Sequence, residues 1–390
     1  MITLSESSWG KEEHVAIANC LREDRLTMGQ KVKIFESEFA KFVGTKHAIM
    51  VNSGSSANLL AAFVCRELNV DKERNTVVVP ALSWSTTYFP WIQAGYKLKF
   101  VDIDPLTLNV DVEKLRKSLT NDVIGMCIPH ILGADAGIVE ILALATEKDI
   151  FVVEDTCESL GAVPNQSNGG SAMLGTFGIA GTYSFFRSHH ISTMEGGMVV
   201  TNNDKFFQFA TSMRAHGWLR ELPKNNLISS SEQDSWEANF KFHLPGFNLR
   251  PLEMSGAIGS EQLKKLPDFL INRRWNASLL RSGLEEIPSL KLQHQTQNGS
   301  WMAFAITVDP KLHSRKQILK QFNDLGIETR PVVAGNFIQQ PVMKRISRSC
   351  ILEDEYPGAE HIHENSFMFA NHGRKMSEEI AALLLALSKI

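Results

Sequence analysis

Short apolar runs alternate with longer amphipathic stretches between residues 45 and 200. The runs are bounded by turn residues, which is typical of strands buried in a parallel sheet, and the amphipathic stretches have the spacing of helices that cover a sheet face. The predicted strands span residues 48–51, 76–79, 98–101, 123–128, 150–153, 179–185 and 197–201. The predicted helices span residues 57–68, 85–94, 112–118, 138–148 and 205–215. This order predicts a large α/β domain around a mostly parallel sheet of seven strands.

The pattern changes after residue 217. Residues 217–247 are irregular and polar, which is too long for an ordinary connection and predicts a surface excursion or a functional loop. Two helices follow at residues 251–263 and 267–284, and then a strand at 302–308, a helix at 314–325, a strand at 328–333 and a closing helix at 378–388. We therefore expect a large domain over residues 1–265, with an N-terminal helical segment, and a smaller α+β domain over residues 266–390.

Composition narrows the class of protein. The chain has 390 residues, 43% of them hydrophobic, with 40 Lys+Arg against 43 Asp+Glu. This apolar fraction excludes a disordered chain, and the lack of a basic excess disfavours nucleic acid as a partner. No apolar run approaches the ~20 residues of a membrane helix, and polar residues follow Met1, so we expect a cytoplasmic protein without membrane contact. Five cysteines lie far apart, a pattern that predicts neither a metal site nor an iron–sulfur cluster.

Two strand ends carry polar residues that could bind a ligand. Residues 52–58, Asn-Ser-Gly-Ser-Ser-Ala-Asn, follow a strand and open a helix, where backbone N–H groups suit a phosphate. Taken alone, the segment is better explained as an ordinary serine-capped helix start. Residues 152–158 end a buried strand in three acidic side chains, and a carboxylate there could hold a protonated ring nitrogen or simply be solvated. Neither segment decides the function alone.

The segment 184–197 contains adjacent histidines, His189 and His190. Neighbouring residues of a strand point to opposite faces, so a single metal ion held by both is unfavourable. One catalytic base is the more economical functional interpretation, although a lone histidine in a loop is commonly structural.

In chain order, seven motifs resemble the sugar aminotransferase family of pyridoxal-phosphate enzymes, which has fold type I, the aspartate-aminotransferase fold. They are Ser-Gly-Ser-Ser-Ala at 53–57, Pro80-x-x-x-Trp84, Glu154-Asp155-x-x-Glu158, Ser184-Phe185, Glu195-Gly196-Gly197, Arg214-x-His216-Gly217 and Gly246-Phe247-Asn248-x-Arg250-Pro251. The resemblance covers essentially the whole chain. It implies that the cofactor, pyridoxal or pyridoxamine 5'-phosphate, is bound by Gly54, Ser55, Ser56, Trp84, Asp155, Glu158, Ser184 and Asn248. Asn248 would come from the partner subunit of a homodimer with shared active sites.

One position departs from the aminotransferases. They carry a lysine, covalently linked to the cofactor, six residues before the glutamate of Glu-Gly-Gly, where this chain has His189; no lysine occurs between Gly161 and Asp204. Glu158 also stands where the aminotransferases commonly have glutamine, three residues after the aspartate that holds the ring nitrogen. Both changes resemble the coenzyme-B6-dependent sugar 3-dehydratases. This subgroup implies removal of the carbon-3 hydroxyl of a nucleotide-linked 4-keto-6-deoxy sugar, such as GDP-4-keto-6-deoxy-D-mannose, with His189 as base and then acid.

The resemblance further implies that L-glutamate regenerates the amine cofactor, without an iron–sulfur reductase as partner. It offers His216 and Arg250 as residues that bind the nucleotide sugar. Three alternatives stay open at this point: a dehydratase of CDP-4-keto-6-deoxyglucose, an aminotransferase that works without the lysine, and a pseudoenzyme that kept the fold and lost the chemistry.

Overall fold

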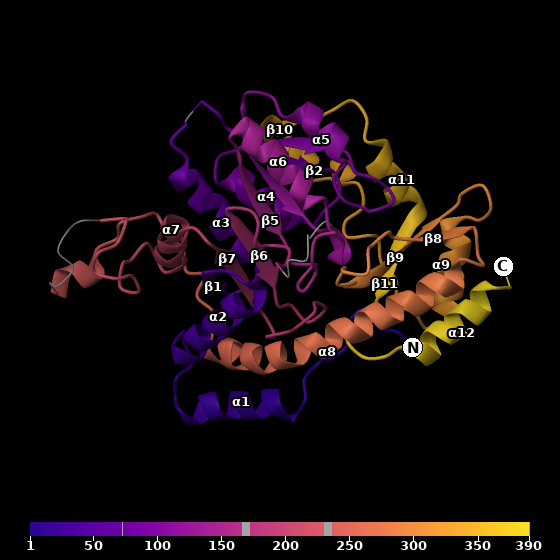
Figure 1. The fold of residues 1–390 in the computed structure, drawn as a ribbon, viewed down its shortest axis with the longest axis horizontal. Coiled ribbons are helices and arrows are strands. Elements are labelled where there is room, and N and C mark those ends of the chain that lie inside the picture. Colours follow the sequence, from indigo (N-terminus) through magenta and orange to yellow (C-terminus); the bar gives the residue numbers. More distant parts are fainter. Residues whose placement is uncertain (72, 166–171, 230–235, 390) are drawn as a thin grey trace.

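The computed structural model describes residues 1–71, 73–165, 172–229 and 236–389. Two sheets organise this part of the chain. The larger has eight strands in the order β1-β7-β6-β5-β4-β2-β3-β10, and the smaller has three in the order β11-β9-β8. Figure 1 shows the large sheet enclosed by helices, with the small sheet and its helices at one end of the molecule, where both termini lie.

The strands of the large sheet confirm the seven that the sequence predicts, with ends shifted by at most two residues. They are β1 (His47–Val51), β2 (Thr76–Pro80), β3 (Lys97–Val101), β4 (Val123–Pro129), β5 (Phe151–Asp155), β6 (Ala180–Ser184) and β7 (Gly197–Thr201), joined by β10 (Cys350–Ile351). Only β7 runs antiparallel to its neighbours β1 and β6. The eighth strand, β10, is a two-residue addition from the C-terminal part that pairs with β3.

Alternating side chains of the strands enter cores on opposite faces of the sheet. Val77 and Val79 of β2 pack in the core that includes helices α3 (Gly54–Leu68), α4 (Ser85–Gln93) and α7 (Asp204–Arg214). Val78 packs in a second core with α5 (Val112–Ser118) and α6 (Ile138–Lys148). A third core holds side chains of β1, β6 and β7 beside α2 (Gln30–Val43). The sheet is thus buried on both sides, as continuous apolar strands require.

A single helix replaces the two predicted at residues 251–263 and 267–284. Helix α8 (Glu253–Leu284) runs through Pro267, so the predicted break is wrong. A proline inside a helix removes one hydrogen bond, but α8 packs along α1 (Lys11–Arg22), α2 and α12 (Ser377–Leu387), and this tertiary packing holds it together. The domain boundary at residue 265 remains a prediction, and α8 continues across it.

The small sheet consists of β8 (Leu290–Leu292), β9 (Ala303–Val308) and β11 (Ser366–Ala370), covered by α9 (Arg315–Asp324), α11 (Pro357–Asn365) and α12. The predicted strand at 328–333 is wrong: the segment makes only an isolated bridge between Arg330 and Met368. Pro331 cannot donate to a ladder, and Val333 has a positive φ of 50°, so the chain turns there. The third strand is β11 instead, antiparallel to β9.

The surface excursion at residues 217–247 is confirmed for its described part. It leaves the body between α7 and α8 as an arm that Figure 1 shows extended to one side. Within the described residues no helix is long and apolar enough to cross a membrane. In the same residues no three His, Cys, Asp or Glu side chains cluster in a way that could hold a metal ion.

Candidate active site

A cavity of about 390 Å³ lies at the carboxyl ends of the parallel strands, where α/β sheets place their ligands. Most of the site residues that the sequence predicts line it: Gly54, Ser55, Trp84, Asp155, Glu158, Ser184 and His189. No lysine lines this cavity within the described part of the chain. Segments far apart in the sequence therefore meet at one place, as the strand order requires.

One corner of the cavity is the first turn of α3. The Ser53 side chain caps the helix by accepting a hydrogen bond from the Ser56 N–H at 3.1 Å. Gly54 is required here because a Cβ atom would lie 2.5 Å from Cβ of Ser184. The free N–H groups of a first helical turn, beside the hydroxyls of Ser55 and Ser184, suit a phosphate. Ser56 itself does not line the cavity; its hydroxyl pairs with Ser53 at 3.0 Å.

Asp155 ends β5 and is 7% exposed. Its Oδ2 accepts hydrogen bonds from Asn58 Nδ2 at 2.9 Å and Thr87 Oγ1 at 2.7 Å, so the carboxylate is fixed in one orientation. Asn58 and Thr87 were missed in the sequence because they come from α3 and α4, and only the fold brings them to β5. A carboxylate fixed by neutral donors keeps its negative charge available to a ligand cation.

Trp84 lies at the cavity wall with 49% of its surface exposed. The guanidinium of Arg330 lies 5.5 Å from the centre of its ring, close enough for a cation–π contact. Arg330 also lines the cavity, and it was not predicted, since it lies in the segment that the pattern suggested to be a strand. The cavity thus offers an aromatic face and one arginine.

The two histidines of the β6–β7 loop (residues 185–196) differ in their surroundings. His190 is 2% exposed, and its Nε2 lies 3.1 Å from the Ser300 carbonyl oxygen, which is a structural contact. His189 lines the cavity, and its Nδ1 has no hydrogen-bond partner among the described residues. The pKa of His189 is lowered to about 4, chiefly by burial and in addition by the charges of Arg273 and Arg330. The imidazole is therefore neutral at pH 7 and able to accept a proton.

Glu158 lines the cavity with one oxygen already bound, since Oε2 accepts a hydrogen bond from the Leu132 N–H at 3.0 Å. The pKa of its carboxyl is raised to about 7, chiefly by burial; the Leu132 N–H and the charge of Arg330 oppose the rise, and the charge of Asp155 adds to it. A carboxyl and an imidazole whose pKa values move in opposite directions are typical of acid–base sites.

Replacing Glu158 with Gln is expected to stabilise the protein more at pH 8 than at pH 4.5. The folded protein holds the Glu158 proton up to about pH 7, whereas an unfolded glutamate releases it near 4.5. The stabilisation that the Glu158 carboxyl contributes to the folded protein is therefore complete below pH 4.5 and is lost as the pH rises through 7. Since Gln does not titrate, the variant's advantage in unfolding free energy should grow by about 2 kcal/mol across that window, allowing for partial exposure.

Urea unfolding of the cofactor-free proteins at both pH values measures this difference. The lowered pKa of His189 makes stability change with pH in the opposite direction. Because wild type and variant both contain His189, this effect cancels when the two are compared. Glu113→Gln, at an exposed carboxylate on α5, is the control for the loss of one carboxylate. A constant difference for Glu158→Gln would contradict the raised pKa.

The β6–β7 loop is held from outside the cavity. Both backbone polar groups of Ser192 are bound: its N–H donates to Gln262 Oε1 at 3.1 Å, and its carbonyl accepts from Trp9 Nε1 at 3.0 Å. Gln262 is fully buried on α8 and also contacts Ser8 and Glu13. The N-terminal segment and α8 thereby fix the loop three residues after His189.

In the glutamate-dependent reaction that the resemblance implies, the substitution Trp9→Phe is expected to lower kcat about tenfold and to leave the KM for L-glutamate and the thermal midpoint nearly unchanged. It removes a single hydrogen bond, worth about 1 kcal/mol, while a small displacement of a catalytic group costs far more in rate. Steady-state kinetics measure both constants. Trp275→Phe, half exposed on α8, is the matched control. An unchanged kcat would show that the Trp9 contact does not position His189.

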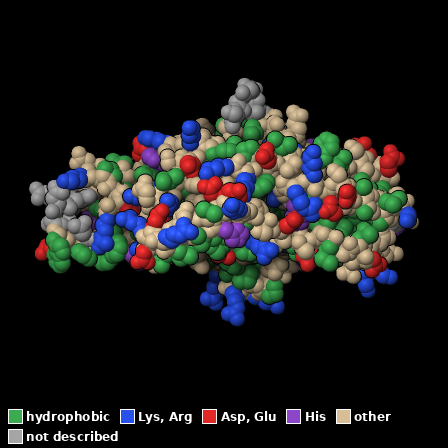
Figure 2. All heavy atoms as spheres, turned by 90° about the horizontal axis from the view of Figure 1, so that it is seen from below, with side chains coloured by type: hydrophobic (Ala, Val, Ile, Leu, Met, Phe, Trp, Pro, Cys, Tyr) green, Lys and Arg blue, Asp and Glu red, His purple; other side chains and the backbone are tan. Residues whose placement is uncertain are grey.

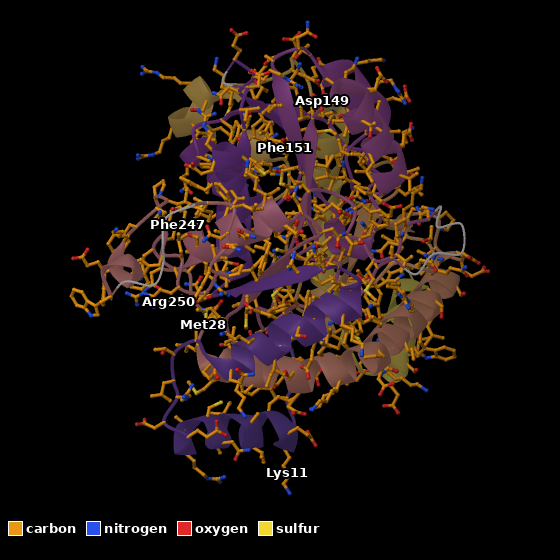
Figure 3. All side chains as sticks on the ribbon, turned by 60° about the vertical axis from the view of Figure 1, so that its left-hand side comes forward. Lys11, Met28, Asp149, Phe151, Phe247 and Arg250 are labelled. Atoms are coloured by element: carbon orange, nitrogen blue, oxygen red, sulfur yellow. The ribbon has the colours of Figure 1, made fainter. Side chains whose placement is uncertain are left out.

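The remaining predicted residues lie elsewhere. His216, Asn248 and Arg250 do not line the cavity but meet one another at the base of the excursion. The His216 N–H donates to the Phe247 carbonyl at 2.7 Å, and Arg250 Nε donates to Asn248 Oδ1 at 3.0 Å. Figure 3 labels Phe247 and Arg250 on the side of the molecule from which the excursion extends. Asn248 and Arg250 are exposed, so they are accessible to another molecule.

These features fit a phosphorylated pyridine cofactor. A glycine and serine corner suits its phosphate, Trp84 offers a face to its ring, and Asp155 offers a fixed carboxylate to its ring nitrogen. The residue types and their order around the cavity agree with the cofactor-binding set that the resemblance implies.

Comparison with known proteins supports the same relationship. The model of the DegT/DnrJ/EryC1/StrS aminotransferase family matches residues 7–386. GDP-4-keto-6-deoxy-D-mannose 3-dehydratase of Yersinia pseudotuberculosis is 41% identical, with 99% of this chain and 98% of the relative covered. The Escherichia coli enzyme of that name, solved with hydrated PLP, superposes with a TM-score of 0.94 at 40% identity, covering 99% of this chain and all of the other.

A further structure of a GDP-4-keto-6-deoxymannose 3-dehydratase contains a trapped PLP–glutamate adduct. It superposes with a TM-score of 0.93 at 40% identity, covering 99% of this chain and all of the other. The family model spans nearly the whole chain, and the cavity carries the family's motifs in order. The chain belongs to the DegT/DnrJ/EryC1/StrS aminotransferase family.

Proposed function

We propose that this protein removes the carbon-3 hydroxyl of GDP-4-keto-6-deoxy-D-mannose in deoxysugar biosynthesis, using pyridoxamine phosphate that L-glutamate regenerates. The observation that carries the proposal is His189, which lines the cavity where aminotransferases of the family need a lysine. Imidazole cannot form a stable covalent link with the cofactor, but it moves protons near neutral pH. The relatives named above act on this sugar nucleotide, and one of them was trapped with PLP and glutamate.

Each cavity residue has a defined task in this proposal. The first turn of α3 with Ser55 and Ser184 would hold the cofactor phosphate, Trp84 would lie against its ring, and Asp155 would hold the ring nitrogen. When bound, the cofactor supplies an electron sink for the carbon that loses a proton. Neutral His189 takes that proton at a ring nitrogen and returns it to the departing hydroxyl, so one residue serves as base and then acid. Retention of this set disfavours a pseudoenzyme.

We further propose a homodimer with shared sites. Asn248 and Arg250 are exposed and outside the cavity of their own chain, as residues that complete a partner's site would be. The excursion beside them exposes Trp236 and Phe242 at 78% and 65%, and Figure 2 shows hydrophobic side chains gathered at that end of the molecule. Exposed aromatic surface of this kind marks a protein interface.

The electron source in this proposal is L-glutamate rather than an iron–sulfur reductase. The five cysteines are separate free thiols, and Cys20, Cys65 and Cys127 are buried. A cluster needs several cysteine thiolates at one place.

A mass-spectrometric product assay tests the function. Purified protein is incubated with pyridoxal phosphate, L-glutamate and GDP-4-keto-6-deoxymannose, with no reductase added. We expect a sugar nucleotide that lacks one oxygen, with 2-oxoglutarate and ammonia released. An amino sugar would instead identify an aminotransferase that works without the lysine, and turnover of the CDP sugar alone would move the proposal to that nucleotide.

A further inference from the structure

The short 3₁₀ turn η1 (Ile131–Gly133), which follows β4, has a strained backbone beside the catalytic cavity. Ile131 lines the cavity, and Leu132 comes next with φ 53° and ψ 20°. This is the left-handed region, which residues other than glycine, asparagine and aspartate rarely adopt. The Leu132 side chain is fully buried. Such a conformation persists only where the surrounding structure holds it.

Both polar groups of the Leu132 backbone are bound by residues that lie far away in the sequence. Its N–H donates to Glu158 Oε2 at 3.0 Å. Its carbonyl oxygen accepts hydrogen bonds from Gln295 Nε2 at 2.9 Å and from the Met302 N–H at 3.0 Å. Gln295 and Met302 belong to the segment between β8 and β9. The part of the chain that builds the small sheet thus holds a turn at the cavity of the large sheet.

Gln295 is committed to this contact. Its side chain is 2% exposed, and its Nε2 also donates to Gln293 Oε1 at 3.0 Å. Gln293 in turn donates to the Ile131 carbonyl oxygen at 3.1 Å. Gln295 Oε1 has no hydrogen-bond partner among the described residues. Burial of an unpaired amide oxygen is unfavourable, and an apolar side chain of the same length would avoid it, so the donor Nε2 is what this position needs.

The direction of the Leu132 N–H decides how Glu158 faces the cavity. Because Oε2 accepts that N–H, Oε1 is the oxygen left without a hydrogen-bond partner among the described residues. The pKa of the carboxyl is raised to about 7, chiefly by burial, which favours the neutral form. In a neutral carboxyl the proton lies on the oxygen that does not accept the N–H. Glu158 would then donate from Oε1, beside Asp155, which accepts.

We propose that Gln295 is a positioning residue of the catalytic cavity: it holds Leu132 in the left-handed conformation, and the Leu132 N–H in turn orients the Glu158 carboxyl toward the cofactor. This inference rests on the proposed function. Gln295 does not itself line the cavity, so it acts through these two hydrogen bonds. Without its Nε2, the Met302 N–H alone would hold the carbonyl oxygen. The Leu132 peptide could then rotate out of its strained conformation and turn its N–H away from Glu158.

Titration of the cofactor-free protein with pyridoxal phosphate, followed by quenching of tryptophan fluorescence, tests the proposal. Gln295→Met keeps the length of the side chain and loses the donor. We expect it to weaken the Kd for pyridoxal phosphate about fivefold and to lower 2-oxoglutarate release from L-glutamate about tenfold. Gln295→Asn, whose amide is one carbon shorter and cannot reach Leu132, should act alike and carries the test if the methionine variant does not fold. Gln321→Met, on α9, also removes an amide whose Oε1 has no partner among the described residues, and it should match wild type.

A second substitution separates positioning from a purely structural role. In a Glu158→Leu background the carboxyl to be oriented is absent, so Gln295→Met should change the Kd for pyridoxal phosphate by less than about twofold. A structural role of Gln295 would weaken binding equally in both backgrounds.

Equal losses in the two backgrounds would overturn the inference, as would an unchanged Kd in both Gln295 variants, and in either case the proposed function stands. Failure of both variants to fold would overturn it as well, since Gln295 would then support the fold rather than one carboxyl. Absence of pyridoxal phosphate binding by wild type would overturn the proposed function and the inference together.

Discussion

The substitution His189→Lys is expected to abolish loss of the carbon-3 hydroxyl and to leave the cofactor covalently attached to the chain. Residue 189 lines the cavity beside Asp155, Ser184 and Glu158, so a lysine amine placed there can react with the cofactor aldehyde. The same change removes the neutral imidazole that would accept the proton in the proposed mechanism. Loss of a positioned general base costs about 10²- to 10⁴-fold in rate. Mass spectrometry of the product and of the borohydride-reduced protein measures both outcomes.

Two companion variants separate the base from the covalent link. His189→Asn removes the imidazole without supplying an amine, so it should lose turnover and bind the cofactor only non-covalently. His313→Asn, at a histidine that does not line the catalytic cavity, should behave like wild type. Deoxygenation retained by the lysine variant at more than a tenth of the wild-type rate would contradict the assignment of His189 as the base.

The large sheet could be predicted because its strands are locally encoded. Each is a short apolar run between turn residues, and burial on both faces needs nothing beyond that run. Strand β10 could not be predicted, since two residues carry no pattern and its pairing with β3 depends on the tertiary fold. Pro267 led to the prediction of a helix end that the structure does not have. Packing of α8 against its neighbouring helices outweighs the local cost of a proline inside the helix. Strand β11 was missed, although the apolar run at Phe367–Phe369 is a local signal for it.

In the candidate site, too, some residues could be predicted from local sequence and others depend on the tertiary fold. Gly54, Asp155 and His189 each follow a predicted strand, and Ser184 lies near the end of one. The ends of parallel strands meet at one sheet edge, so the gathering of these residues could be expected. Thr87, Arg330 and Trp9 could not be found in this way. They come from a helix, an irregular segment and the N-terminal segment. Thr87 donates a hydrogen bond to Asp155, Arg330 lies against the ring of Trp84, and Trp9 donates to the Ser192 carbonyl in the β6–β7 loop. Sequence motifs thus indicated the candidate catalytic and cofactor-binding residues, whereas the residues that hold them in position could be found only from the fold.

The substitution Asp155→Asn is expected to leave the fold intact and to lower both the glutamate half-reaction and sugar turnover by roughly 100-fold or more. An asparagine oxygen can still accept the hydrogen bonds that Asn58 and Thr87 now give to Oδ2, so the side chain keeps its place. What it loses is the negative charge that would keep the ring nitrogen protonated. Without that charge the ring withdraws electrons poorly, and the proton that His189 must remove becomes less acidic.

The readouts for Asp155→Asn distinguish lost chemistry from lost binding. Cofactor retention after gel filtration reports on affinity, the circular dichroism spectrum reports on the fold, and 2-oxoglutarate release reports on the first half-reaction. Asp324→Asn, at the exposed end of α9, removes one carboxylate charge outside the cavity and should change none of these three readouts. Because Asn58 and Thr87 hold Oδ2 from two helices, the variant's cavity should keep its shape. A rate within twofold of wild type would therefore mean that the charge of Asp155 does not drive the reaction.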